Sequence, residues 1–259
     1  MIPTVRVYAV LGIKGGVGKS LIAIALAKAL SRYYNVGLVD CDIDSSNVPG
    51  MLDAKEGMKL SKDGVRFIPV WVTPKLKMVS LESIGFGRKR AAITKEGKQH
   101  QQIIRDLIEQ TVWGRTQVLI ADMPAGSSDE FLGVMSIFDH LDGCIAVAQP
   151  STAEDFHRVI DLCKYYGINL MGVIENMNGT LTECGVPAAC PVCHKEFSPL
   201  GKDVIRDICM QKGVTYLGGI PLTSGKLDLE NYLEQIGYPI RNIMSKIIIG
   251  DEVCPTQPL

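Results

Sequence analysis

The chain has 259 residues, of which 46% are hydrophobic and 21% charged, and its formal net charge is -1. This length suffices for one large α/β domain with a substantial core, and the composition is that of an ordinary globular protein. The balanced charge gives no basis for binding nucleic acid, no apolar stretch is long enough to span a membrane, and no signal peptide pattern is present. We therefore expect a cytoplasmic protein whose eight cysteines are core thiols or metal ligands rather than disulfides.

Apolar runs alternate with helical patterns along the whole chain. Strands are predicted at Val5–Ile13, Val36–Asp40, Val118–Asp122, Gly143–Gln149, Leu170–Asn176 and Tyr216–Ile220, and Val65–Val72 and Lys77–Leu81 are predicted as further strands or a hairpin. Helices are predicted at Lys19–Arg32, Lys98–Gln110, Thr152–Tyr166 and Gly201–Lys212, with a core helix at Arg241–Ile249. Continuous apolar strands between helices predict an α/β fold, a doubly wound and mostly parallel sheet with helices on both faces. Because no linker composition interrupts residues 1–259, we expect a single domain.

A glycine-rich loop follows the first predicted strand. From Lys14 to Ser20 the sequence reads KGGVGKS, close to the phosphate-binding pattern G-x-x-x-x-G-K-[ST], although Gly12 lies one residue too early for its first glycine. The glycines let backbone amides turn toward an anion, Lys19 can reach the β- and γ-phosphates of ATP, and the Ser20 hydroxyl can bind Mg²⁺. The residues predicted to contact the nucleotide here are Gly15, Gly16, Val17, Gly18, Lys19, Ser20 and Leu21.

Carboxylates follow two other predicted strands. Asp40 and Asp42 lie on either side of Cys41, and paired carboxylates near Mg-ATP can hold metal-bound waters or orient the attacking water. Asp122 follows four aliphatic residues as a Walker B-type carboxylate that holds Mg²⁺ through water, and the Gly126 amide is suited to sensing the γ-phosphate.

Two further residues are candidates for the base pocket. Asn176 has a side-chain amide suited to the adenine edge, and the backbone at Pro221 can line the same pocket. In parallel α/β folds ligands bind at the carboxyl ends of the strands. All these motifs follow strands, so the sequence predicts one nucleotide site.

The KGGVGKS string resembles the deviant Walker A motif of the MinD/ParA/nitrogenase-iron-protein class. This resemblance implies that Lys14 contacts the phosphates of a partner subunit, so that ATP is sandwiched in a homodimer. It also implies that Asp42 positions the attacking water and that Asp40 supports the metal shell. Lys14, Lys19 and Asp42 are the catalytic candidates.

From end to end the chain resembles the Mrp/ApbC-type ATPases, which are iron–sulfur cluster carriers. The resembling segments are Lys14–Ser20, Val36–Asp44, Ser83–Phe86, Val118–Gly126 with Asp129, Gly172–Asn178, Cys190–Cys193 and Gly218–Leu222. The resemblance implies a homodimeric ATPase with slow hydrolysis that delivers a cluster to apoproteins. The chain departs from the family at Leu21, where a threonine is usual, at Ala125, where a second proline is frequent, and at Asp44-Ser45-Ser46. These departures leave the client pathway open.

The densest group of thiols lies in a loop at about residues 178–200. Cys190 and Cys193 form a Cys-x-x-Cys turn stiffened by Pro191, which can bring two sulfurs onto one metal. A 4Fe–4S cluster needs four thiolates, and the resemblance implies that a homodimer supplies two from each chain. Zinc is an equally good occupant by chemistry, and Cys184 is a possible third ligand.

A positioning ATPase of the MinD/ParA kind is the alternative function. It would require a basic amphipathic helix at the C-terminus or a basic DNA-binding face. Whether ATP hydrolysis drives cluster loading or cluster release is not indicated by the sequence.

Overall fold

The computed structural model describes residues 5–43, 46–54, 56–83, 100–126, 129–138, 140–223 and 237–248. It divides into two compact units, the first formed by residues 1–11 and 19–143 and the second by residues 12–18 and 144–259. The single domain expected for residues 1–259 stays a prediction, and each unit is described below by itself.

The first unit contains a five-stranded sheet. Its strands lie in the order β1 (Arg6–Leu11), β7 (Val118–Asp122), β2 (Val36–Asp40), β6 (Leu76–Val79) and β5 (Val70–Thr73). All neighbours are parallel except the antiparallel pair β5 and β6, and a separate antiparallel pair joins β3 (Lys59–Leu60) to β4 (Phe67–Ile68). Every residue of β2 and β7 is buried, as expected for parallel strands covered on both faces.

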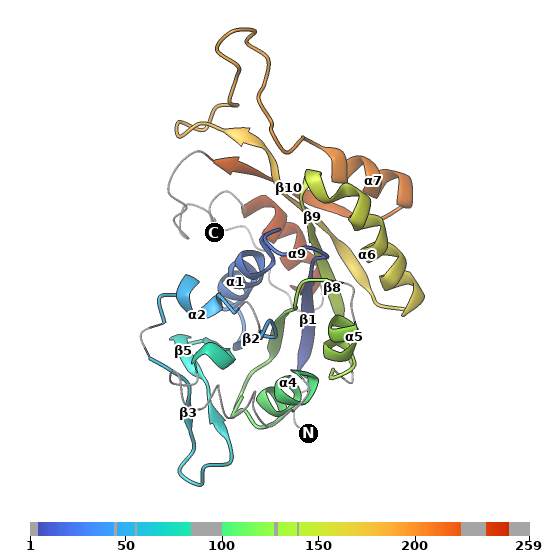
Figure 1. Cartoon of the computed structure of the whole chain (residues 1–259). Coiled ribbons are helices and arrows are strands. Elements are labelled where there is room, and N and C mark those ends of the chain that lie inside the picture. The colour runs from blue at the N-terminus through green and yellow to red at the C-terminus, as the bar shows by residue number, and fades with distance from the viewer. Residues whose placement is uncertain are drawn as a thin grey trace. The chain divides into compact units, whose positions relative to one another are not determined.

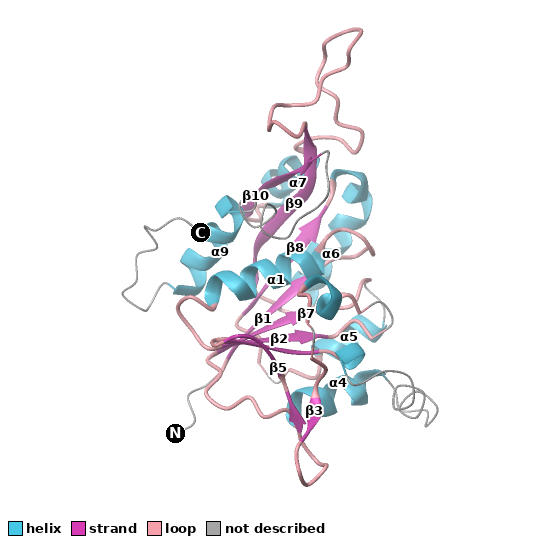
Figure 2. Ribbon diagram, turned by 90° about the vertical axis from the view of Figure 1, so that its left-hand side faces the viewer, coloured by secondary structure: helices cyan, strands magenta, loops and turns pink. Residues whose placement is uncertain are grey.

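Helices cover both faces of this sheet (Figures 1 and 2). Helix α1 (Lys19–Leu30) packs on β1, β7 and β2, while α4 (His100–Glu109) and α5 (Asp129–Met135) lie together on the other side. Helix α1 is apolar on nearly all sides, which suits a buried position. The short helix α2 (Val48–Met51) and the 3-10 turn η1 (Leu81–Ser83) complete the described helical elements of the unit.

The second unit contains the parallel strands β8 (Gly143–Ala148), β9 (Leu170–Leu181) and β10 (Tyr216–Thr223), in that order. Helix α9 (Gly237–Ile248) lies on one side of β9 and β10 (Figure 1). Helices α6 (Ala153–Tyr165) and α7 (Val204–Lys212) lie on the other side. The 3-10 turn η2 (Pro150–Thr152) precedes α6. Pro221 interrupts the pairing of β10 with β9, and β10 ends the strand order, where a missing amide hydrogen is tolerated.

These elements confirm the α/β class and the mostly parallel strands predicted from the sequence. Strands β2 and β7 have the predicted bounds, and residues predicted as the hairpin form β5 and β6. Strand β1 ends two residues early at Leu11, and β9 continues five residues past Asn176. Helix α7 begins at Val204 rather than Gly201, because Gly201 (φ 100°) and Asp203 (φ 60°) adopt left-handed conformations.

Several sequence expectations lie outside the described residues. These are residues 84–86, Asp44 and Ser45 from the resembling segments, and the side chain of Asp129. The core helix expected at Arg241–Ile249 is confirmed as α9, whose Ile243, Met244 and Ile247 are buried. No helix among the described residues is long and apolar enough to cross a bilayer.

Close packing around β2 makes one glycine sensitive to substitution. A Cβ atom at Gly37 would meet the Trp113 ring at 2.6 Å and the Leu119 side chain at 2.8 Å. We predict that Gly37→Ala lowers the free energy of unfolding by about 1–3 kcal/mol, measured by urea denaturation. Gly50→Ala in α2 is the matched control, because its Cβ meets nothing within 4 Å and should be neutral or stabilising. Equal stability of Gly37→Ala and the parent would contradict this packing.

Candidate nucleotide site and metal centre

The glycine-rich loop, residues 12–18, belongs to the second unit. Gly16 (φ 79°) and Gly18 (φ 97°) hold conformations that other residues rarely adopt, which explains their positions in the loop. A Cβ at Gly15 or Gly16 would meet no atom within 4 Å, so the loop backbone is open to a ligand. A Cβ at Gly18, in contrast, would collide with the side-chain amide of Asn176.

Asn176 ties this loop to strand β9. Its side-chain nitrogen donates a hydrogen bond of 2.8 Å to the Val17 carbonyl, and the residue is 4% exposed. Ile220, the neighbour of Pro221, is the cross-strand partner of Asn176, so the two residues predicted to line the base pocket are close together. Reading of the adenine edge by Asn176 stays a prediction.

Lys14 forms an ion pair that the sequence did not reveal. Its ammonium lies 2.6 Å from Asp155 in the first turn of α6, and Arg158 lies 3.4 Å from the same carboxylate. Lys14 lowers the pKa of Asp155, chiefly by hydrogen bonding. An acidic residue in a first helical turn is ordinarily interpreted as favourable to the helix dipole, so no pattern in the sequence connects Asp155 with Lys14.

Three predicted residues, Lys19, Ser20 and Asp122, come together in the first unit. Lys19 and Ser20 begin α1, and Asp122 ends β7 as the cross-strand partner of Asp40. Both carboxylate oxygens of Asp122 are buried and lack a hydrogen-bond partner of normal geometry among the described residues. Burial, assisted by Asp40, raises the pKa of Asp122 from 3.8 to about 8, although the nearby Ser20 hydroxyl and Lys19 ammonium oppose this rise.

Lys19 is itself nearly buried, at 6% exposure. Burial lowers the pKa of its ammonium group, while Asp122 and Asp42 raise it. An unpaired buried carboxylate next to a hydroxyl is the donor set that a hydrated Mg²⁺ ion requires. The residues at this position therefore fit Mg²⁺, with Ser20 and Asp122 as its holders.

Asp40 has a different environment from Asp122. Its carboxylate accepts hydrogen bonds from the hydroxyls of Ser46 and Ser80 and from the backbone amide of Asp42, at 2.5, 3.0 and 3.2 Å. Burial still raises its pKa to about 6. Asp40 thus fixes the segment that carries Asp42. Sequence analysis missed Ser46 and Ser80, because isolated serines in loops have no distinguishing pattern.

Strand β9 leads directly into the segment that carries the Cys-x-x-Cys. Bridges from Leu181 to Pro187 and from Ala189 to Glu196 fold residues 181–197 into two successive antiparallel turns, hereafter the thiol hairpin (Figure 1). At its tip the His194 amide donates to the Cys190 carbonyl, and the Cys190 amide donates to the Lys195 carbonyl.

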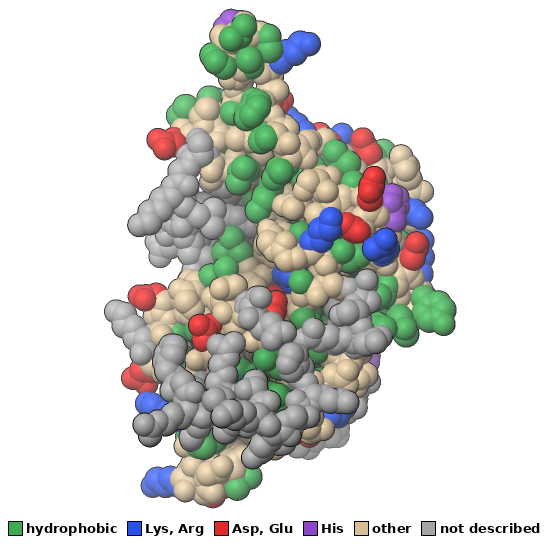
Figure 3. Space-filling model, viewed as in Figure 1, with side chains coloured by type: hydrophobic (Ala, Val, Ile, Leu, Met, Phe, Trp, Pro, Cys, Tyr) green, Lys and Arg blue, Asp and Glu red, His purple; other side chains and the backbone are tan. Residues whose placement is uncertain are grey.

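The turn favours the thiolate form of Cys190. Backbone amides of Cys193 and Val192 donate to its sulfur, and together with the Cys193 thiol they lower its pKa. Cys193 is exposed and Cys190 half-buried. Apolar side chains gather at this tip (Figure 3), where Val192 is 87% exposed. Two adjacent thiols in such a turn can bind one metal centre.

The remaining described cysteines are separate from this pair. Cys184 is exposed in the turn at the opposite end of the hairpin strand, and the Thr182 hydroxyl lowers its pKa. Over the described part of the chain, no group of three or more His, Cys, Asp and Glu residues could hold a metal ion. A role for Cys184 as a third ligand stays a prediction. Cys144, Cys163 and Cys209 are buried, as predicted.

A glycine loop between a buried strand and a helix beginning Lys19-Ser20, with Asp122 at the end of a neighbouring parallel strand, defines a P-loop NTPase. The family model for ParA, described as NUBPL iron-transfer P-loop NTPase, matches residues 4–238. The chain belongs to this family.

Curated relatives agree with this assignment. The cytosolic Fe-S cluster assembly factor CFD1 of Candida glabrata is 32% identical over 232 residues, covering 86% of this chain and 78% of the relative. The cytosolic Fe-S cluster assembly factor NUBP2 of Bos taurus is 30% identical, covering 84% and 79%. An iron-sulfur cluster carrier protein of Methanocaldococcus jannaschii is 32% identical, covering 81% and 70%.

Solved structures support the fold. A nucleotide-binding protein of Archaeoglobus fulgidus in complex with ADP has a TM-score of 0.65 at 22% identity, covering 88% of this chain and 85% of its own. The septum site-determining protein MinD of Pyrococcus horikoshii, complexed with Mg-ADP, has a TM-score of 0.62 at 18% identity, covering 96% and 100%.

The raised pKa of Asp122 predicts an unusual dependence of folding stability on pH. Its folded-state pKa is raised, so between about pH 4 and 8 the folded chain retains a proton that the unfolded chain has released. Stability of the metal-free protein should therefore fall as pH rises through this window. We predict that Asp122→Asn raises the metal-free melting temperature at pH 8 by several degrees and flattens this slope, yet loses Mg²⁺-dependent ATP hydrolysis.

Thermal unfolding in a chelator, from pH 5 to 8.5, measures this effect. Asp207→Asn, which removes an exposed surface carboxylate, is the control. A lower melting temperature for Asp122→Asn across the whole range would show that the carboxylate is not an uncompensated buried group.

Proposed function

We propose that this chain is an ATP-dependent iron–sulfur cluster carrier that works as a homodimer and delivers its cluster to apoproteins. The observation that carries the proposal is the exposed Cys190–Cys193 turn on a hairpin that continues β9, the strand whose Asn176 holds the glycine-rich loop. The printed names of the relatives, assembly factors and a cluster carrier, support the same activity.

In this proposal the loop amides and Lys19 bind the phosphates of ATP. The loop and α1 are joined by the Gly18–Lys19 peptide bond, so one phosphate chain can meet both. Ser20 and Asp122 would hold Mg²⁺, which would supply positive charge to neutralise the phosphates. Asp42 orients the attacking water, Asp40 holds the Asp42 backbone, and the Gly126 amide senses the γ-phosphate.

The cluster is cargo rather than a resident cofactor. Two thiolates from one chain leave a four-iron cluster half-ligated, so a second copy must supply the other two. We infer a 4Fe–4S cluster bound by Cys190 and Cys193 of both copies. An exposed turn suits a centre that is given away, whereas a structural zinc, the alternative occupant, is ordinarily enclosed by four ligands.

Strand β9 supplies a route from nucleotide to cargo. Asn176 contacts the loop, Glu175 accepts a hydrogen bond of 2.9 Å from the Ile205 amide at the start of α7, and Asn178 bonds Asp203 just before that helix. A loop rearranged by phosphate would therefore displace β9 and the thiol hairpin that continues it. A positioning ATPase is less well supported, because the apolar face of α9 packs on β9 and β10 instead of being free.

Dimerisation should respond to the Lys14–Asp155 ion pair. Lys14 can reach a partner's phosphates only after leaving Asp155, so this pair opposes the dimer. We predict that Asp155→Asn strengthens nucleotide-dependent dimerisation severalfold and that Lys14→Ala abolishes it. Sedimentation velocity with Mg²⁺ and a non-hydrolysable ATP analogue measures both. Glu154→Gln, one residue away on α6, is the control, and a parent that stays monomeric under these conditions would refute the sandwiched dimer.

The thiol pair provides the direct test of the function. We predict that Cys190→Ser combined with Cys193→Ser loses the cluster and its transfer to an apoprotein but retains ATP binding. Cys184→Ser, on the same hairpin, should keep the cluster, and Lys19→Ala should keep the cluster but lose tight ATP binding.

Anaerobic reconstitution, the visible spectrum, and iron, sulfide and zinc assays per subunit measure these outcomes. About four irons per two chains indicates the four-iron cluster. Zinc without sulfide in protein purified anaerobically, or transfer at the parent's rate by the double variant, would overturn the carrier proposal.

A further inference from the structure

Strand β5 (Val70–Thr73) ends the strand order of the first unit and has β6 as its one pairing partner in the described structure. Edge strands normally avoid unwanted pairing with charged or proline residues. Pro69 precedes β5, but the strand itself reads Val-Trp-Val-Thr and carries no charge. Its outer backbone groups are therefore available to another strand.

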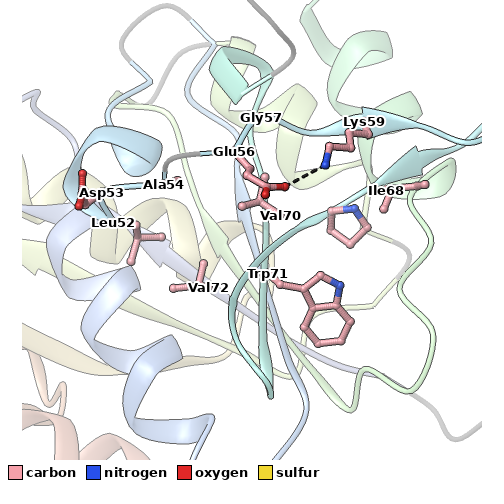
Figure 4. Close-up of a pocket in the computed structure, with 11 residues that line it drawn as sticks. Leu52, Asp53, Ala54, Glu56, Gly57, Lys59, Ile68, Val70, Trp71 and Val72 are labelled. Atoms are coloured by element: carbon pink, nitrogen blue, oxygen red, sulfur yellow. Dashed lines mark hydrogen bonds and ion pairs between the residues drawn. The ribbon is translucent and has the colours of Figure 1, made fainter.

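A cavity of about 450 Å³ lies along this edge (Figure 4). Three consecutive strand residues, Val70, Trp71 and Val72, all line it. Successive side chains of a strand point to opposite faces, so a cavity that contacts all three runs beside the strand rather than over one face. Its other walls come from the segment after α2 and from the β3–β4 pair, namely Leu52, Asp53, Ala54, Glu56, Gly57, Lys59, Ile68 and Pro69.

Large apolar side chains are unusually exposed around this cavity. Trp71 is 58% exposed and Ile68 40%. The Lys77 ammonium lies 4.6 Å from the centre of the Trp71 ring and donates to the Trp113 carbonyl at 2.6 Å, which fixes one face of the indole. A rigid, half-exposed indole beside a cavity is an effective anchor for a partner side chain.

Among the described residues that line the cavity, Asp53 and Glu56 are acidic and Lys59 is basic. Lys59 is paired with Glu56 at 2.8 Å, whereas no cation pairs with the exposed Asp53 in the described structure. Asp53 also has a left-handed backbone (φ 47°), which directs this loop around the cavity mouth. A cationic side chain complements the remaining carboxylate.

We propose that the β5 edge and this cavity bind an extended polypeptide segment of a partner protein, in which apolar side chains alternate with lysine or arginine. The segment adds a strand to β5, one apolar side chain enters the cavity against Trp71, and a basic one pairs with Asp53. Main-chain pairing supplies affinity in this mode of recognition, and the cavity supplies specificity. This surface is distinct from the residues proposed to bind nucleotide and cluster.

Random twelve-residue peptides displayed on phage, selected on the immobilised full-length chain, are the probe. We expect enriched peptides with alternating apolar and basic residues. A synthetic copy should protect β5 amides from hydrogen exchange, and N-methylation of alternate peptide nitrogens should weaken it at least about tenfold, which corresponds to 1.4 kcal/mol. Trp71→Ala should weaken binding by a similar factor, and Asp53→Asn should remove most of its salt dependence.

Tyr165→Ala is the matched control, because it removes an aromatic side chain that is 83% exposed on α6 and should leave binding intact. All these variants lie at exposed positions, and unchanged melting temperatures and ATP hydrolysis verify folding. The proposal is overturned if no peptide is enriched, if enriched peptides bind Trp71→Ala as well as the parent, or if N-methylation has no effect. Concentration-dependent dimers lost in Trp71→Ala would instead assign the edge to a second copy.

Discussion

The buried carboxylate of Asp122, whose oxygens lack a hydrogen-bond partner of normal geometry among the described residues, is the main constraint on the first unit. Asp122 ends a fully buried strand, and its cross-strand partner is a second carboxylate, Asp40. Two such groups side by side are unfavourable in any fold that has no cation to offer them. The chain satisfies one of them with two serine hydroxyls and an amide, and leaves the other for a ligand. A buried carboxylate of this kind destabilises the metal-free protein, and the proposed Mg²⁺ would offset that cost.

In the second unit, one strand, β9, carries the residues on which the proposed function depends. Strand β9 is longer than its neighbours and carries, in succession, a buried carboxylate that caps α7, an amide that holds the glycine-rich loop, and the thiol hairpin. Tyr216 on β10 donates to that carboxylate at 3.0 Å, so the strand is braced from its neighbour as well.

Sequence patterns predicted much of this architecture for physical reasons. Buried parallel strands must be continuously apolar, which is why the bounds of β2 and β7 could be predicted. The loop glycines follow from the backbone conformations that phosphate binding demands. In contrast, the extension of β9 past Asn176 could not be anticipated, because Asn178, Gly179 and Thr180 do not form an apolar strand pattern, and the extension depends on the pairing of Thr180 and Leu181 with β10.

Long-range partners were equally invisible in the sequence. Lys14 and Asp155 lie far apart in the sequence, and no local pattern links them. The role of Ser46 and Ser80 depends on the Asp40 carboxylate, which accepts hydrogen bonds from both hydroxyls. The exposed β5 edge was missed because alternation of apolar residues predicts a strand without indicating whether it has one neighbour or two.

The tip of the thiol hairpin has a chemical liability. A thiolate favoured by backbone amides reacts readily with oxidants, and exposure gives those oxidants access. An empty hairpin would close into a strained local disulfide or cross-link to another copy, and either event consumes the sulfurs that cargo needs. Such a molecule is therefore most easily inactivated after it has released one cluster and before it receives the next. A reducing environment slows this inactivation because it keeps the thiols reduced.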